Sequence, residues 1–176
     1  MDNLNEGGKA VANVMPIQAE YVMPTLKDID KKILQRFLKL KGKDWAALGS
    51  TGKKLPGQSS GDIDIAIDIN KIASDLKIPL EEVGQKIYDI LESAYPKMDK
   101  NYMKGLSIIS LAYPIKGSGG NVQVDLMLQD NIEFAKWMFH SPDFTKQESQ
   151  WKGLYRTELL KAIGNAVTIP DMTTYW

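Results

Sequence analysis

The segment from Asp62 to Ile69 constrains the fold of this chain more than any other, because acidic and apolar residues alternate along it. Successive side chains of a β-strand point to opposite faces of the sheet. As a strand, the segment places Asp62 and Asp64 together on one face. The opposite face is then apolar and is predicted to be buried; its residues are Ile63, Ile65, Ile67 and Ile69.

Asp62 and Asp64, placed side by side on one strand face, repel each other electrostatically. Residues two apart on a strand are about 6.5 Å apart at the backbone, so their carboxylates can come within about 5 Å. At an effective dielectric constant near 20 this repulsion is roughly 3 kcal/mol. A divalent cation between the oxygens would turn the repulsion into attraction, and hard cations prefer carboxylate ligands. The pattern therefore predicts a metal site, although a solvated edge strand with alternating charges would look similar.

A tight turn precedes this strand. Residues 45–48 form a short apolar run, a predicted strand, that leads into Gly49 and Ser50. Glycine allows the backbone to approach a ligand closely, and a helix starting near Ser50 would offer free amides to phosphate oxygens. Lys53 and Lys54 follow at once. The loop is not a P-loop, because Ala47 and Lys54 occupy positions where that motif needs a glycine and a serine or threonine.

A third acid lies in a later predicted strand. The runs 106–115 and 121–128 are strand-like, and the glycine-rich segment 117–120 between them predicts a hairpin. Asp125 falls in the middle of the second run, with apolar residues on both sides. Acids are depleted from strands, so an acid at this place indicates a partner charge or a metal.

The remaining apolar periodicity predicts helices. Pro24 and Thr25 are expected to open the first one, with Thr25 as its cap and Gly42 at its end. Asn70 is expected to cap a short helix, and Pro79 and Pro96 to bound a longer one. Helical patterns resume over 132–139 and 150–163. The predicted fold class is α+β (mixed α/β), with a small mixed sheet flanked by helices.

Three sequence pieces carry a resemblance to a known family: Leu48-Gly49-Ser50, Asp62-Ile63-Asp64-Ile65 and Val124-Asp125-Leu126. Together they resemble the signature of the nucleotidyltransferase superfamily typified by DNA polymerase β, over roughly residues 25–130. The resemblance implies a polymerase β-like nucleotidyltransferase fold. A catalytic core is then expected over 25–130, after a flexible leader over 1–24 that its glycines, asparagines and prolines predict. Residues 131–176 are expected to form a C-terminal helical extension, with a truncated second domain as the alternative.

The resemblance implies a role for each candidate residue. Asp62, Asp64 and Asp125 would be catalytic and would hold two Mg²⁺ ions, with Mn²⁺ as a substitute. Gly49 and Ser50 would hold the β- and γ-phosphates of a nucleoside triphosphate. Lys53 and Lys54, which the family pattern does not fix, are expected to complement the phosphate charge, and Lys152 and Tyr155 to contact the triphosphate and the base. The alternative for these last four is an ordinary solvated loop or helix surface. Asp68 is interpreted as solvent-facing or structural, and His140 as a helix C-terminal cap.

The expected activity is metal-dependent transfer of a nucleotidyl group from a nucleoside triphosphate to an acceptor hydroxyl. The acceptor, an RNA or DNA 3′ end, a protein or a small molecule, stays open, as do the base and the oligomeric state. The alternative is a non-catalytic nucleotide-sensing or protein-binding module with the same fold. The absence of cysteine excludes thiolate-ligated metals, and the net charge of +0 gives no overall attraction to nucleic acid. No secretory signal or membrane span is visible, so a cytoplasmic location and no membrane partner are expected.

Overall fold

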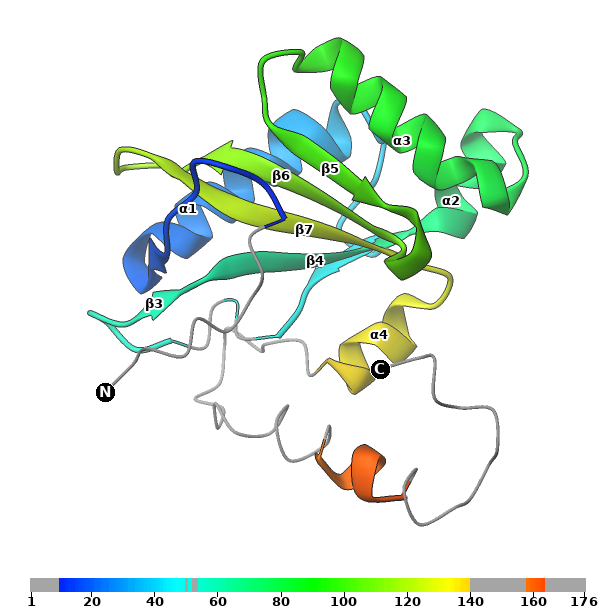
Figure 1. Ribbon diagram of the computed structural model, residues 1–176. Helices are drawn as coiled ribbons and strands as arrows, with labels where there is room; N and C mark the ends of the chain where they lie inside the picture. The colour runs from blue at the N-terminus through cyan, green and yellow to red at the C-terminus, as the bar shows by residue number, and fades with distance from the viewer. Residues whose placement is uncertain (1–9, 50, 52–53, 140–157, 164–176) are drawn as a thin grey trace.

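A five-stranded mixed sheet forms the centre of the computed structural model, which describes residues 10–49, 51, 54–139 and 158–163 (Figure 1). Strands β4 and β7 run parallel, whereas the other neighbours are antiparallel. In spatial order the strands are β2 (Trp45–Ala47), β4 (Asp62–Asp68), β7 (Asn121–Gln129), β6 (Ile108–Pro114) and β5 (Lys100–Met103). The predicted α+β class with a small mixed sheet is confirmed.

The two faces of the sheet differ in chemistry, as the alternation in β4 predicted. Ile63, Ile65 and Ile67 are fully buried in the main core, where they join side chains of β6 and β7. Three helical segments cover this face: α1 (Ala19–Ile29), the π-helix η1 (Asp30–Gln35) and α3 (Leu80–Ala94). On the other face, Ala66 packs with Ala135 of α4 (Ile132–Met138) in a smaller apolar cluster. The acids of β4 and β7 therefore share the face that α4 only partly covers.

The predicted hairpin joins β6 to β7 and is confirmed. Gly117 and Gly120 both have a φ of +89°, a conformation that favours glycine. The register places Ser110 of β6 opposite Asp125 of β7. Strand β6 begins at Ile108, after a short 3-10 turn, η2 (Lys104–Leu106), whereas the predicted strand began at Leu106. Strand β5 was not predicted, because its polar residues lack a strand-like alternation.

The N-terminal part of the fold differs from the expectation. Helix α1 begins at Ala19, and Pro24 lies inside it. Pro24 has no N–H to donate to the carbonyl of Glu20, which lies in the exposed first turn, so only one backbone bond is lost and the cost is small. Thr25 is buried and does not cap the helix; its Oγ1 accepts a hydrogen bond from the backbone N–H of Lys116 (3.0 Å). The predicted helix start at Pro24–Thr25 is therefore wrong.

Residues 10–24, which were expected to belong to a leader, are part of the folded domain. The short strand β1 (Ile17–Gln18) pairs antiparallel with β3 (Ser59–Ser60), in the connection that leads into β4. Ile17 is fully buried, and this burial draws the segment onto the domain.

The predicted end of the first helix was also wrong. The helical run ends at Gln35. The left-handed residue that follows it is Lys39, with a φ of +57°, whereas the sequence predicted that Gly42 would end the helix.

Helix α2 (Ile69–Leu76) is capped by Asp68, and not by Asn70 as predicted. Asp68 Oδ1 accepts hydrogen bonds from the backbone N–H groups of Asn70 and Lys71, at 2.9 and 3.1 Å. The side chain of Asn70 instead donates to the carbonyl of Asp130. This capping bond confirms the structural interpretation of Asp68. Helix α3 begins after Pro79 and ends before Pro96, as expected.

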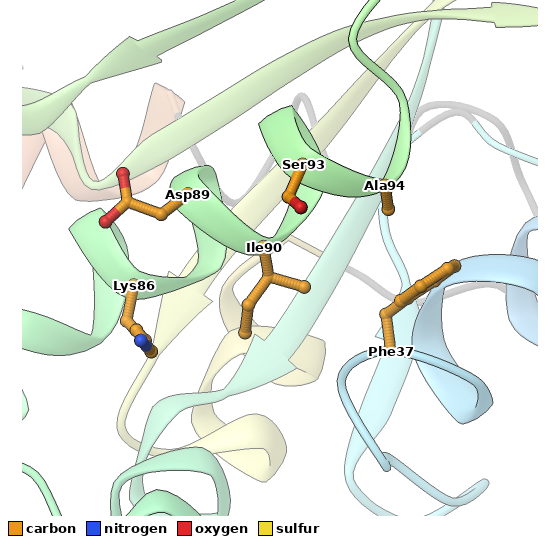
Figure 2. A pocket seen from close by; sticks show the side chains of 6 residues that line it. All are labelled: Phe37, Lys86, Asp89, Ile90, Ser93 and Ala94. Atoms are coloured by element: carbon orange, nitrogen blue, oxygen red, sulfur yellow. The ribbon is translucent and has the colours of Figure 1, made fainter.

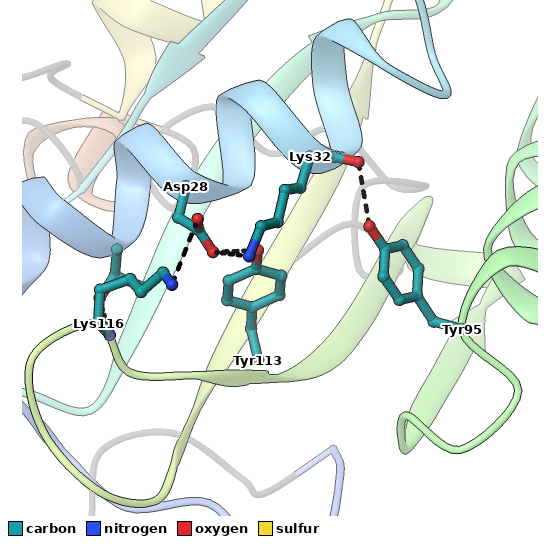
Figure 3. A network of polar contacts seen from close by, with 6 residues as sticks. Asp28, Lys32, Tyr95, Tyr113 and Lys116 are labelled. Atoms are coloured by element: carbon teal, nitrogen blue, oxygen red, sulfur yellow. Dashed lines mark hydrogen bonds and ion pairs between the residues drawn. The ribbon is translucent and has the colours of Figure 1, made fainter.

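A half-buried polar network ties α1 to β6 (Figure 3). The hydroxyl of Tyr113 donates to Asp28 Oδ2 (2.8 Å), and Lys32 and Lys116 form ion pairs with the same carboxylate. Burial alone would raise the pKa of Asp28, but the hydrogen bonds from Tyr113 and Lys32 and the two lysine charges together lower it. Burial and the bond to Asp28 raise the pKa of Tyr113 far above its ordinary range. The network therefore joins α1 to β6.

Towards the C-terminus, the predicted helix over 132–139 is confirmed as α4. Residues 158–163 are helical, whereas the first part of the helix predicted over 150–163 lies outside the described residues. Within the part of the chain that the structure describes, none of the helices has the length and apolar character needed to cross a membrane.

Candidate metal centre

Three carboxylates converge on the half-covered face of the sheet. Asp64 of β4 lies directly opposite Asp125 of β7 in the parallel pair, and Asp62 precedes Asp64 on the same face. Each residue offers a carboxylate oxygen, and these three oxygens all lie within 4.8 Å of one another. All three side chains are half-buried. The structure thus brings together the three acids that the sequence predicted to share a site.

Burial and neighbouring charge raise the proton affinity of Asp62 and Asp64. Burial, followed by the charges of Asp62 and Asp125, raises the pKa of Asp64 to about 7. Burial and the charge of Asp125 also raise the pKa of Asp62, against a lowering effect of its own backbone N–H. Ionised together, the acids repel, and protons or a cation among the oxygens would relieve this repulsion. The donor set consists of carboxylates alone and fits a hard divalent cation such as Mg²⁺ or Mn²⁺.

Gly49 brings the preceding loop against this cluster. It has a φ of +61°, and the N–H of Leu48 beside it donates to the carbonyl of Asp64 (2.9 Å). A Cβ atom at position 49 would lie 2.8 Å from Asp64 Oδ2. Two features therefore favour glycine at position 49: the left-handed backbone, and the Asp64 carboxylate that a Cβ atom would press against.

The loop amides on either side of Ser50 already have acceptors. The N–H of Gly49 donates to the carbonyl of Phe139 at the end of α4 (3.1 Å), and the N–H of Thr51 to that of Leu48 (3.2 Å). Thr51 is buried, and its Oγ1 accepts from the N–H of Asp64. These bonds fix the loop to β4. A phosphate would take the Gly49 amide only by displacing the end of α4.

Asp125 is held by two neighbours that sequence reasoning missed. The hydroxyl of Ser110 donates to Asp125 Oδ1 at 2.6 Å. The amide Nε2 of Gln123 donates to Oδ1 and Oδ2, at 3.2 and 3.1 Å. The period-two alternation already places Gln123 on the same face as Asp125, so the sequence contained a signal for it. Ser110 could be found only with the register of the hairpin.

The remaining predicted nucleotide-binding residues are not tested by the geometry. Lys54 is half-buried in the connection to β4, and within the described residues no hydrogen bond or ion pair joins it to the three acids. The others lie outside the described residues, as does His140; they are Ser50, Lys53, Lys152 and Tyr155. Their phosphate and base contacts stay predictions.

A cavity of about 340 Å³ lies on the far side of the sheet and is separate from the acidic cluster (Figure 2). It is lined by Phe37 and by residues of α3, the helix that packs on the isoleucine face; these are Lys86, Asp89, Ile90, Ser93 and Ala94. The sheet therefore separates it from the carboxylates. Its lining has one lysine and one aspartate and offers no convergent set of ligands.

Comparisons with protein-family models, with curated proteins and with solved structures found no match to this chain.

Proposed function

We propose that the protein is a metal-dependent nucleotidyltransferase, which moves a nucleoside monophosphate from a nucleoside triphosphate to an acceptor hydroxyl. The observation that carries the proposal is the convergence of Asp62, Asp64 and Asp125 against the turn at Gly49. The parallel pairing of β4 with β7, which aligns Asp64 with Asp125, supports the further proposal that the sheet is of the polymerase β-like type.

In this reaction the three aspartates would have distinct roles. Asp62 and Asp64 would hold two Mg²⁺ or Mn²⁺ ions, and Asp125 would complete the ligand set. Bound there, the ions supply positive charge to the phosphates and lower the pKa of a hydroxyl. The acceptor oxygen forms a bond to the α-phosphorus, the bond from that phosphorus to the bridging oxygen breaks, and pyrophosphate leaves. Asp125 would take up the proton of the acceptor hydroxyl.

One observation favours the alternative, a nucleotide-sensing or protein-binding module. The N–H groups of Gly49 and Thr51 both donate to backbone carbonyls, so they are occupied in the arrangement described. Phosphate binding would then depend on the rest of the loop and on its lysines. A sensing module would bind a nucleoside triphosphate and release no pyrophosphate.

The experiment measures pyrophosphate release from each of the four ribonucleoside triphosphates, with Mg²⁺ or Mn²⁺. Total RNA and then a protein extract serve as the acceptor. Asp64→Asn and Asp125→Asn are expected to abolish release. Asp68→Asn is the matched control, because it removes one charge from the same face of β4 while its side-chain oxygen can still cap α2. Triphosphate binding without release would support the sensing module, and wild-type turnover in Asp64→Asn would refute the proposed site.

A further inference from the structure

Gln123 is a buried polar side chain beside the carboxylate cluster, with only 6% of its surface exposed. In the parallel pair it lies opposite Asp62, and it precedes Asp125 by two positions on the same strand face. It therefore lies on β7 and beside β4, next to acids of both strands. A buried amide at this place requires hydrogen-bond partners for its oxygen and its nitrogen.

The partners of Gln123 fix the orientation of its amide. Its Oε1 accepts a hydrogen bond from the backbone N–H of Ala10 (2.9 Å). A backbone N–H can only donate, so the oxygen faces Ala10 and the NH₂ group must face Asp125. There Nε2 bridges both carboxylate oxygens. Bonds from a donor to both oxygens restrict the rotation of the Asp125 carboxylate.

Residues 10–15, here called the N-terminal strap, are attached to the sheet at further points. The N–H of Met15 donates to the carbonyl of Asn121 (2.9 Å), and the N–H of Ala12 donates to Asp99 Oδ2 (2.6 Å). Val11 is buried with 5% of its surface exposed. Figure 1 shows the strap, in dark blue, crossing in front of the sheet. Because it is held at several places, the strap can serve as a fixed support for the Gln123 amide.

We infer that Gln123 is a positioning residue for the metal centre and that the N-terminal strap holds it in place. The chain of contacts runs from the Ala10 amide through the Gln123 side chain to Asp125. This inference rests on the proposed function, since it assigns Gln123 a role in orienting a ligand of that same site. Partners that orient metal ligands change metal affinity when they are removed, typically by 10- to 100-fold.

The test is Mn²⁺ binding to the full chain, followed by the electron paramagnetic resonance signal of free Mn²⁺. Gln123→Met keeps the length of the side chain and removes the amide, and is expected to weaken Mn²⁺ binding about tenfold. Gln129→Met is the matched control, since it makes the same change on the same strand face at the other end of β7. It is expected to bind Mn²⁺ as the wild type does.

A second pair of variants tests the strap without altering the core. Ala10→Pro removes the N–H that holds Gln123, and Ala12→Pro removes the bond to Asp99 instead. The first is expected to weaken Mn²⁺ binding, by less than Gln123→Met does, and the second to leave it unchanged. If Gln123→Met and Ala10→Pro both bind Mn²⁺ as tightly as the wild type, the inference is overturned while the proposed function stands. A wild-type protein that binds no Mn²⁺ overturns both.

Discussion

Replacement of Gly49 by alanine is expected to disrupt the proposed metal centre by a defined steric contact. The new Cβ would lie 2.8 Å from Asp64 Oδ2, whereas ordinary contact begins at 3.4 Å, so the carboxylate must retreat by about 0.6 Å. Metal–ligand distances tolerate only about 0.2 Å. The substitution therefore removes Asp64 from the geometry that it shares with Asp125. We expect Mn²⁺ affinity to fall at least about tenfold.

A second cost of Gly49→Ala comes from the backbone, and a matched variant separates it. Gly57 also has a positive φ, +81°, but nothing lies within 4 Å of a Cβ built there. A left-handed conformation costs a residue with a side chain about 1–2 kcal/mol. Gly57→Ala is thus expected to lose that much stability and to keep its Mn²⁺ affinity.

The assay combines urea unfolding, followed by circular dichroism, with Mn²⁺ titration of both variants. Gly49→Ala should lose at least as much free energy of unfolding as Gly57→Ala, and it alone should bind Mn²⁺ weakly. If the two variants bind Mn²⁺ equally well, the contact between Gly49 and Asp64 does not govern the site, and the reasoning fails.

Three further predictions concern stability. In the metal-free protein the pKa of Asp64 is raised from 3.8 to about 7, so the folded state keeps a proton that the unfolded chain releases. Stability should fall as the pH rises from about 4 to 7, by up to about 4 kcal/mol, and Asp64→Asn should flatten this slope in urea unfolding with EDTA. Equal slopes in both proteins would contradict the raised pKa. Tyr113→Phe removes the donor to Asp28 and should cost about 1–2 kcal/mol in thermal unfolding; an unchanged midpoint would show that the lysines alone satisfy Asp28. Asp68→Ala should cost about 1 kcal/mol through loss of the α2 cap and Asp68→Asn much less, and equal losses would argue against the capping bond.

The acidic face was predictable because strands have a fixed side-chain period. In β4, alternation alone separated the buried isoleucines from Asp62 and Asp64. The same rule gave the side of β7 on which Asp125 lies. It could not give the pairing of β4 with β7, since pairing between distant strands depends on tertiary packing.

The N-terminal region was misread for a related reason. Pro24 is a strong local signal for a helix start, but the burial of Ile17 and Val22 outweighs one lost hydrogen bond at an exposed turn. Local propensity therefore gave the wrong boundary. For the same reason the contact between the N-terminal strap and Gln123 was not predicted, because the segment was interpreted as a flexible leader.

The parallel pairing of β4 with β7 has a consequence for how the protein can be studied. Asp64 and Asp125 come from strands that have two α-helices and two other strands between them in the chain. A slip of one residue between β4 and β7 would turn Asp125 towards the buried isoleucine face and separate it from its partners. Three convergent carboxylates therefore exist only in the correctly registered fold. If the centre binds a metal ion, bound Mn²⁺ would serve as a spectroscopic reporter of completed folding.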